Sequence, residues 1–201
     1  MLDSAIQQVL KPVLSRMARG LVRAGIGADA LTFIGFAIGM AAAVSIAFQH
    51  FMVGLVLLLL SRLMDGLDGA VARLTQPTDL GGFLDITLDF LFYAAIPLAF
   101  AVADPAQNAL PAAVLLASFM GTASSFLAFA IVAAQRGITS TALPDKSFYF
   151  LGGLTEATET IAAFVAMCLW PQWFAPIAWG FAALCAITTA LRIGWGCQRL
   201  K

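Results

Sequence analysis

Residues 61–89 read SRLMDGLDGAVARLTQPTDLGGFLDITLD and join two mostly apolar runs of the chain, at 52–74 and 80–102. Each run is longer than the roughly 20 residues that a membrane-spanning helix needs. Between the runs, Gln76-Pro77-Thr78 has the composition of a tight turn. The segment therefore predicts two antiparallel helices in a membrane, with acidic residues close to the turn that joins them.

The rest of the chain is apolar as well. Of its 201 residues, 61% are hydrophobic and 11% are charged, whereas a typical soluble domain is about 25% charged. This composition excludes a soluble globular domain and a disordered chain, and the net charge of zero argues against a nucleic-acid-binding protein. We expect an all-α membrane protein with six transmembrane helices, at 29–48, 52–74, 80–102, 109–135, 149–169 and 172–195.

The N-terminal segment has a different pattern, in which apolar residues recur at helical spacing with basic residues between them. The apolar residues are Leu2, Ile6, Val9, Val13, Met17 and Leu21, and the basic ones are Lys11, Arg16, Arg19 and Arg23. This pattern predicts an amphipathic helix lying in the membrane interface; the alternative is a juxtamembrane segment that only sets the topology. We therefore divide the chain into an amphipathic helix at 1–24 and a six-helix transmembrane domain at 25–201.

Basic residues are distributed unequally between the two sides of the predicted bundle. The loops near 49–50, 104–105 and 170–171 contain no Lys or Arg. The other side carries Lys11, Arg16, Arg19, Arg23, Arg73, Arg136, Lys146, Arg192, Arg199 and Lys201. By the positive-inside rule that side is cytoplasmic. Both termini and the acidic segment are therefore expected at the cytoplasmic face.

Four aspartates lie on matching faces of the two predicted helices around the turn. Asp65 and Asp68 are three residues apart, and Asp85 and Asp89 are four apart. At about 100° per residue, each pair shares one face of its helix. Because the turn makes the two helices antiparallel neighbours, the four carboxylates are expected to converge.

A cluster of four carboxylates at membrane depth requires compensation. Each costs on the order of 2.5–3.5 kcal/mol even on the most lenient scale, and together they repel unless they bind protons or cations. Hard oxygen ligands suit Mg²⁺ or Mn²⁺, and two such ions would balance four carboxylates. The alternative interpretation is structural, with Arg62 and Arg73 forming ion pairs, but these two residues could neutralise only two of the four acids.

The surroundings of the aspartates suit a phosphorylated substrate. Paired divalent ions favour displacement at phosphorus, where they bridge phosphoryl oxygens. Small residues would allow a diphosphate to approach the backbone, at Gly69, Ala72, Gly81 and Gly82. Arg73 could bind phosphate oxygens through its guanidinium.

The pattern Asp65-x-x-Asp68-Gly69-x-x-Ala72-Arg73, followed by Gly81-x-x-x-Asp85-x-x-x-Asp89, resembles the motif of the CDP-alcohol phosphotransferases, also called CDP-alcohol phosphatidyltransferases. The size and the six expected spans are similar to that family as well. The spacer from Arg73 to Gly81 is one residue shorter than is usual there. At the first span this chain has Ala28-Asp29-Ala30-Leu31-Thr32 where family members often have Pro-Asn-x-x-Thr.

The resemblance implies a role for each motif aspartate. Asp65, Asp68 and Asp85 would ligate the metal ions, and Asp89 would ligate one ion and act as general base on the acceptor hydroxyl. This assignment is chemically reasonable, because an alcohol becomes a good nucleophile when a carboxylate within hydrogen-bond reach takes its proton.

The resemblance also implies a site for the CDP part of the donor. Gly69, Ala72 and Arg73 would hold it, with further contacts from Thr32 and Asp29 at the start of the first span. For Asp29 an alternative is a purely structural role as the N-cap of that helix.

The implied activity is transfer of a phosphatidyl-type group from a CDP-linked donor, CDP-diacylglycerol, to an alcohol with release of CMP, by a metal-dependent homodimer of the bacterial inner membrane. The acceptor stays open between glycerol 3-phosphate, an inositol phosphate, serine and a sphingolipid-type alcohol. Basic residues favour a phosphorylated polyol, and the candidates for binding it are Arg136, Lys146, Arg192 and Glu156. For Glu156 and Arg192 the alternative is an ion pair that holds the last two helices together, and for Arg136 and Lys146 it is a role in membrane topology alone.

Two other classes of membrane protein also use intramembrane acids. A prenyltransferase binds a diphosphate through Asp clusters and Mg²⁺, but its acidic motifs lie on separate helices without the Asp-Gly-x-x-Ala-Arg element. An ion-coupled transporter usually has broken helices at the midplane or an inverted repeat, whereas the acids here cluster near one face. Only the transferase is expected to release CMP from a CDP-lipid.

Overall fold

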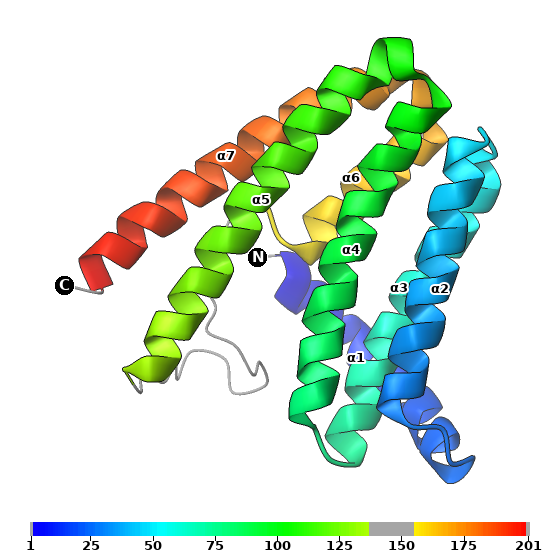
Figure 1. Cartoon of the computed structure of the whole chain (residues 1–201). Coiled ribbons are helices and arrows are strands. Elements are labelled where there is room, and N and C mark those ends of the chain that lie inside the picture. Colours follow the sequence, from blue (N-terminus) through cyan, green and yellow to red (C-terminus); the bar gives the residue numbers. More distant parts are fainter. Residues whose placement is uncertain (1, 137–154, 200–201) are drawn as a thin grey trace.

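The computed structural model describes residues 2–136 and 155–199, which are almost entirely helical (Figure 1). The elements in order are α1 (Leu2–Arg23), α2 (Ala28–Ala47), α3 (Phe51–Leu74), α4 (Asp79–Ala103), α5 (Pro105–Gln135), α6 (Ala157–Leu169), the 3₁₀ helix η1 (Pro171–Trp173) and α7 (Phe174–Arg199). No strand occurs among these residues, which confirms the all-α fold class.

Short turns alternate between the two ends of the bundle. The α2–α3 and α4–α5 turns and η1 lie at one end, and the α3–α4 turn at 75–78 lies at the other (Figure 1). This is the arrangement that the turn residues predicted. At the 75–78 turn, the Thr78 hydroxyl caps α4 by accepting a hydrogen bond from the Gly81 N–H at 3.0 Å.

Within residues 2–136 and 155–199, four helices are long and apolar enough to cross a membrane: Ala28–Ala47, Asp79–Ala103, Pro105–Gln135 and Pro171–Gln198. α3 is 24 residues long but carries several charged residues near the turn, which lower its hydropathy. α6 has 13 residues, fewer than the roughly 20 that a span needs. The expected span at 149–169 lies partly outside the described residues, and its described part is a helix only from Ala157 onward.

The packing around the predicted hairpin differs from the expectation. α3 and α4 are antiparallel, but they do not pack closely on each other; α2 packs against both. Two glycines of α2 permit this approach: a Cβ at Gly35 would lie 2.9 Å from Met64 Cβ, and one at Gly39 would lie 2.6 Å from the Phe92 ring. Small residues four apart are typical of closely packed membrane helices. The gap left between α3 and α4 is where the polar side chains of the acidic segment meet.

The helices enclose a large apolar core at the end away from the acidic segment. Its largest side chains are fully buried phenylalanines, and the rings of Phe100 and Phe174 stack with centroids 4.7 Å apart. Asn108 is buried beside this core and donates a hydrogen bond to the Phe100 carbonyl at 3.1 Å. This end of the molecule therefore has a structural role.

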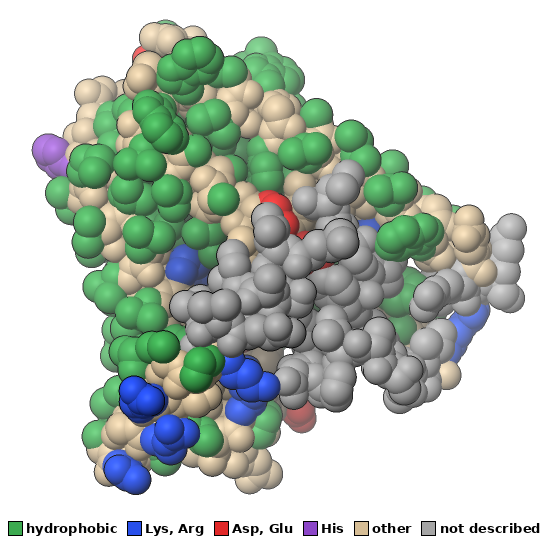
Figure 2. Space-filling view, turned by 180° about the vertical axis from the view of Figure 1, so that it is seen from behind, with side chains coloured by type: hydrophobic (Ala, Val, Ile, Leu, Met, Phe, Trp, Pro, Cys, Tyr) green, Lys and Arg blue, Asp and Glu red, His purple; other side chains and the backbone are tan. Residues whose placement is uncertain are grey.

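α1 packs across α3, and part of its apolar residues face away from the bundle. Ala18 is buried against Leu67, Ala70 and Val71, and α1 contributes Leu14, Leu21 and Val22 around them. Val13 and Met17, which belong to the predicted apolar stripe, are 56% and 42% exposed. Since the apolar residues of α1 cover more than one face, only part of them meets the bundle. Figure 2, which shows the molecule from behind, has Lys and Arg side chains gathered at its lower end.

Candidate active site

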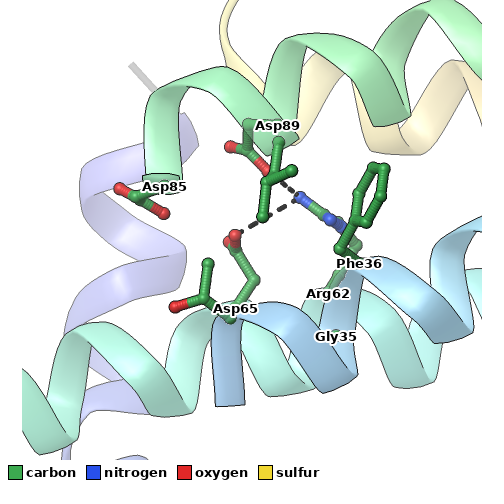
Figure 3. Close-up of a pocket in the computed structure, with 8 residues that line it drawn as sticks. Gly35, Phe36, Arg62, Asp65, Asp85 and Asp89 are labelled. Carbon is green, nitrogen blue, oxygen red and sulfur yellow. Dashed lines mark hydrogen bonds and ion pairs between the residues drawn. The ribbon is translucent and has the colours of Figure 1, made fainter. Parts of the chain in front are cut away.

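A pocket lies among α2, α3 and α4, beside the turn that joins the last two (Figure 3). Its lining residues are Thr32, Gly35, Phe36, Arg62, Asp65, Asp85, Leu88 and Asp89. Three of the four predicted aspartates are among them, and Figure 3 shows these carboxylates facing the same space from α3 and α4. The gap between these two helices is therefore a polar, acid-lined pocket.

Asp65, Asp68 and Asp85 form a group suited to a metal ion. Each offers one carboxylate oxygen, and these oxygens all lie within 4.8 Å of one another. Helical spacing brings the first two together on α3, and the antiparallel α4 supplies the third. The predicted convergence of acids around the turn is therefore present for these three residues.

Asp68 is the most deeply placed of the three, with 5% of its surface exposed. Its Oδ2 accepts a hydrogen bond from the Thr32 hydroxyl at 2.7 Å. The Thr32 hydroxyl is also 3.1 Å from the Ala28 carbonyl of the preceding helical turn. Because a buried carboxylate is costly without partners, this contact links α2 directly to the acidic motif.

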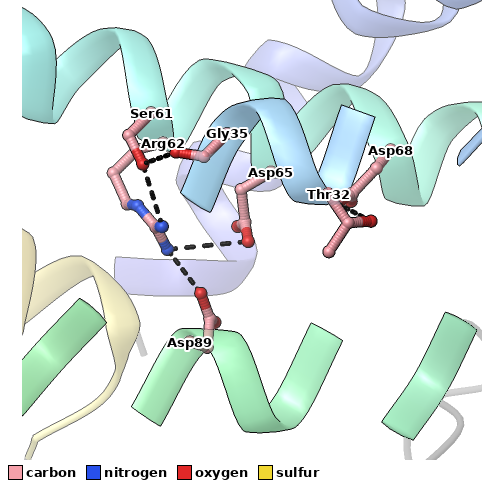
Figure 4. A network of polar contacts seen from close by, with 7 residues as sticks. All are labelled: Thr32, Gly35, Ser61, Arg62, Asp65, Asp68 and Asp89. Carbon is pink, nitrogen blue, oxygen red and sulfur yellow. Dashed lines mark hydrogen bonds and ion pairs between the residues drawn. The ribbon is translucent and has the colours of Figure 1, made fainter. Parts of the chain in front are cut away.

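Asp89 lies on the other side of the pocket and contacts Arg62. Arg62 Nη1 donates to Asp89 Oδ1 at 2.6 Å and lies 3.5 Å from Asp65 Oδ1 (Figure 4). The side chain of Arg62 is 10% exposed, and those of Asp89 and Asp65 are 27% and 35% exposed. The ion pairing that the structural interpretation expected is therefore present at one arginine, Arg62, which pairs with two of the four aspartates.

The residues predicted to hold CDP surround the open side of this group. Arg73 is exposed, and its guanidinium covers Gly69, where a Cβ would lie 3.3 Å from Arg73 Nη1. Asp29 Oδ1 would lie 3.2 Å from a Cβ at Gly81. Asp29 is not the N-cap of α2, because Gly27 occupies that position; the capping alternative is wrong. Ala72 is half-buried on α3, near the same end.

The described candidates for binding the acceptor, Arg136, Glu156 and Arg192, are not among the residues that line the pocket. Arg192 Nη1 on α7 donates to the Thr122 carbonyl of α5 at 3.0 Å, and Arg136 is exposed at the C-terminal end of α5. Lys146 lies outside the described residues. Glu156 and Arg192 lie close enough for an electrostatic interaction between their charges.

Glu156 itself is placed differently from the prediction. It is the N-cap of α6 rather than a residue within a helix, and with Glu159 it forms a capping box. In this arrangement the side chain of each glutamate accepts a hydrogen bond from the backbone N–H of the other glutamate. The sequence prediction missed this because it began the helix earlier, at residue 149.

Two features of the site were not predicted in their present roles. Arg62 was considered only as a structural partner, although its spacing of three from Asp65 places both on one face of α3. Gly35 and Gly39 were overlooked, although two small residues four apart are a recognisable sign of close helix approach.

A sequence model of the CDP-alcohol phosphatidyltransferase family matches residues 26–191 of the chain. The chain belongs to this family. As a CDP-alcohol phosphatidyltransferase it is a phosphotransferase enzyme of phospholipid synthesis, and the resemblance drawn from its acidic motif is confirmed. Membership gives no support to the prenyltransferase and transporter alternatives.

Two known proteins are similar in sequence to all or part of this chain. It is 53% identical over 201 residues to the inner membrane protein YnjF of Escherichia coli, covering all of this chain and 98% of that one. It is 37% identical over 94 residues to an archaetidylinositol phosphate synthase of Pyrococcus horikoshii, which corresponds to 46% of this chain and 50% of the relative.

The fold of this phosphatidyltransferase also matches solved structures. The phosphatidylinositol phosphate synthase PgsA1 of Mycobacterium tuberculosis, with CDP-DAG bound, superposes with a TM-score of 0.72 over 91% of this chain and 92% of the other, at 21% identity. The same protein in complex with manganese and citrate superposes with a TM-score of 0.70. At this level of identity the match shows a shared fold.

Proposed function

We propose that this enzyme transfers the phosphatidyl group of CDP-diacylglycerol to an alcohol and releases CMP. The observation that carries the proposal is the convergence of Asp65, Asp68 and Asp85 within 4.8 Å, beside Asp89, in a chain of this family. A structural relative with CDP-DAG bound supports a CDP-lipid as the donor.

The three converging carboxylates fit a divalent metal ion, because each offers a hard oxygen and the oxygens are close enough to share one ion. We assign Asp65, Asp68, Asp85 and Asp89 as ligands of two Mg²⁺ or Mn²⁺ ions, an assignment supported by the manganese complex of the same structural relative. When bound, the ions would offset the negative charge of the diphosphate and of the departing CMP.

Asp89 would act as the general base. Its carboxylate takes the proton of the acceptor hydroxyl, and the acceptor oxygen forms a bond to the phosphorus that carries the lipid. The bond between that phosphorus and the oxygen shared with CMP breaks, and CMP leaves with that oxygen. Asp89 suits this role because it faces the pocket while one of its oxygens is held by Arg62.

The CDP part would lie over the start of α4 and the end of α3. Arg73 is exposed there and can bind phosphate oxygens in a bidentate manner. Gly69 and Ala72 leave its guanidinium access to the helix surface, and Thr32 and Asp29 border the same region from α2. These five residues form the proposed donor site.

The acceptor would be a phosphorylated polyol, such as an inositol phosphate or glycerol 3-phosphate. One protein that is similar in sequence and one that is similar in fold are named as synthases of inositol phosphate lipids, which supports this class of substrate. Arg136, Lys146 and Arg192 are the cations proposed to bind the acceptor phosphate, and Glu156 is the group proposed to orient Arg192.

The proposed topology has six spans, among them α3 and the segment at 149–169, of which α6 is the described helix. The amphipathic helix at 1–24 would lie in the membrane interface, and residues 25–201 would form the transmembrane domain. By the positive-inside rule, the distribution of basic residues supports a cytoplasmic location for both termini and the active site. Similarity to an E. coli inner membrane protein supports an inner membrane location, and we propose that the enzyme is a homodimer.

The deciding experiment measures CMP release by purified protein in detergent with CDP-diacylglycerol and Mg²⁺. One acceptor is added at a time: inositol 1-phosphate, glycerol 3-phosphate, free inositol, free glycerol or serine. We expect release that depends on a phosphorylated polyol and is lost on adding EDTA. Equal release with the unphosphorylated polyols would contradict the acceptor assignment, and no release with any acceptor by folded protein would contradict the proposed activity.

A further inference from the structure

The guanidinium of Arg62 is held on several sides at once. Its Nη1 donates to Asp89 Oδ1 at 2.6 Å, and its Nη2 donates to the Ser61 hydroxyl at 3.2 Å. Its central carbon lies 3.9 Å from the centroid of the Phe92 ring, a distance at which a cation is attracted to the face of an aromatic ring. Asp65 Oδ1 completes the surroundings at 3.5 Å (Figure 4).

The groups behind Arg62 are themselves fixed. The Ser61 hydroxyl donates to the Gly35 carbonyl at 2.7 Å, so its oxygen lone pairs are directed to the arginine. A Cβ at Gly39 would lie 2.6 Å from the Phe92 ring and 2.9 Å from Ser61 Oγ. Glycine at this position therefore leaves room for both supports, and α2, α3 and α4 together determine where the guanidinium lies.

The contact with Arg62 makes the two carboxylate oxygens of Asp89 differ in their surroundings. Arg62 binds Oδ1, and within the described part of the chain no hydrogen bond engages Oδ2. A carboxylate rotates easily about its terminal bond, so a donor on one oxygen fixes the direction of the other. Oδ2 is then the oxygen presented to the pocket.

We propose that Arg62 is a positioning residue that orients Asp89 for proton abstraction from the acceptor. The inference rests on the proposed function, in which Asp89 is the base. Arg62 acts through Asp89, as the orienting group of a catalytic triad acts through its base.

Stability alone is a weak reason for this arrangement. Removing a charged pair from water is costly, and replacing a buried pair by apolar residues of similar size is often neutral or stabilising. Arg62 also reaches acids on two helices, Asp65 on α3 and Asp89 on α4, at the wall of the pocket. A pair that only joined helices would not need to lie there.

The test compares Arg62→Lys and Arg62→Met with wild type in the CMP-release assay, with Mn²⁺ affinity measured separately by electron paramagnetic resonance. Lysine keeps the charge but loses the planar fork and the second donor. We expect Arg62→Lys to lower kcat about 10-fold and Arg62→Met about 100-fold. The KM for CDP-diacylglycerol should change by less than about twofold. The Mn²⁺ affinity should not fall, because removing a cation beside the proposed ligands Asp65 and Asp89 does not weaken their attraction for the ion.

Asn108→Ala is the matched control, because it removes a buried side-chain hydrogen bond at the other end of the bundle. It should lower the melting temperature and leave kcat unchanged. A purely structural role for Arg62 would give the same result in the Arg62 variants, namely a lower melting temperature with wild-type kcat, and would overturn the proposal.

A double-mutant cycle decides whether Arg62 acts through Asp89. Adding Arg62→Met to Asp89→Asn should lower the residual CMP release no further. A further loss in the double variant, or a loss of Mn²⁺ affinity that matches the loss of kcat, would overturn the positioning role while the proposed activity stands. Absence of CMP release from wild type would instead overturn the activity itself.

Discussion

Two half-buried arginines, Arg62 on α3 and Arg192 on α7, show how differently the two halves of the bundle use a charge. Both have an Nε that is buried and has no hydrogen-bond partner among the described residues. Arg62 faces two carboxylates in a pocket and lies on a phenylalanine ring. Arg192 donates to a main-chain carbonyl of α5, with the Phe126 ring 5.8 Å away.

The difference lies in what surrounds each guanidinium. Arg62 is held by charged and polar groups of α3 and α4, which suits a residue that must stay in one position. Arg192 donates a hydrogen bond to the Thr122 carbonyl through one of its five N–H groups, so other donors of the guanidinium can bind a substrate phosphate. The burial of an arginine is therefore less informative than the identity and number of its partners.

The largest expected effect is that of Asp89→Asn, which removes the proposed base from the half of the bundle that contains Arg62. Turnover should fall about 10²–10⁴-fold, because proton transfer to the carboxylate is lost. Folding should change little, since the asparagine oxygen can still accept from Arg62. The check is CMP release together with the melting temperature in detergent. Asp79→Asn, an exposed acid at the start of the same helix, is the control, and turnover near wild type in Asp89→Asn would contradict the base assignment.

Asp68→Asn tests the metal group in the same half. We expect Mn²⁺ to bind about 100-fold more weakly, since even loss of a residue that supports a ligand typically costs 10–100-fold. Thr32→Val, which removes the donor to Asp68 Oδ2, should weaken binding about 10-fold. Asp104→Asn is the control, because asparagine also caps a helix well and Asp104 caps α5 at the opposite end. Unchanged Mn²⁺ affinity in Asp68→Asn would remove this residue from the ligand set.

Arg192→Met tests the other half and should give a different kinetic result. We expect the KM for the phosphorylated acceptor to rise about 10-fold, because a hydrogen bond to a charged group is worth roughly 1.5–3 kcal/mol. The KM for CDP-diacylglycerol and the Mn²⁺ affinity should not change. A lower melting temperature with an unchanged acceptor KM would show instead that Arg192 only joins α7 to α5.

The smallest expected effects come from the glycines that allow close packing in each half. Gly39→Ala should lower the free energy of unfolding by about 1–3 kcal/mol, because the new Cβ meets an aromatic ring. At Gly121 a Cβ would meet Thr189 Oγ1 at 3.1 Å, and that side chain can move aside, so Gly121→Ala should have a smaller effect. Melting temperatures check both, with Gly180→Ala, which faces open space, as the control. An equal effect at Gly39 and Gly121 would contradict the difference in packing.

The sequence alone predicted the all-helical architecture and the ends of most helices. Hydropathy and turn residues are local properties, so the turns at 75–78 and near Asp104 appear where they were expected. The convergence of Asp65, Asp68 and Asp85 was also predictable, because helical spacing determines which side chains share a face. The motif around these residues was sufficient to indicate the family before any comparison.

Only the tertiary structure decided how the helices pack and which partners the charged groups take. α2 packs against both α3 and α4, because Gly35 and Gly39 leave room there, while the acidic side chains occupy the gap between α3 and α4. The same packing brings Arg62 to Asp89, 27 residues away in the chain, and leaves Val13 and Met17 of α1 exposed. Such contacts depend on the shapes of side chains from several helices at once, which the periodicity of any one segment does not contain.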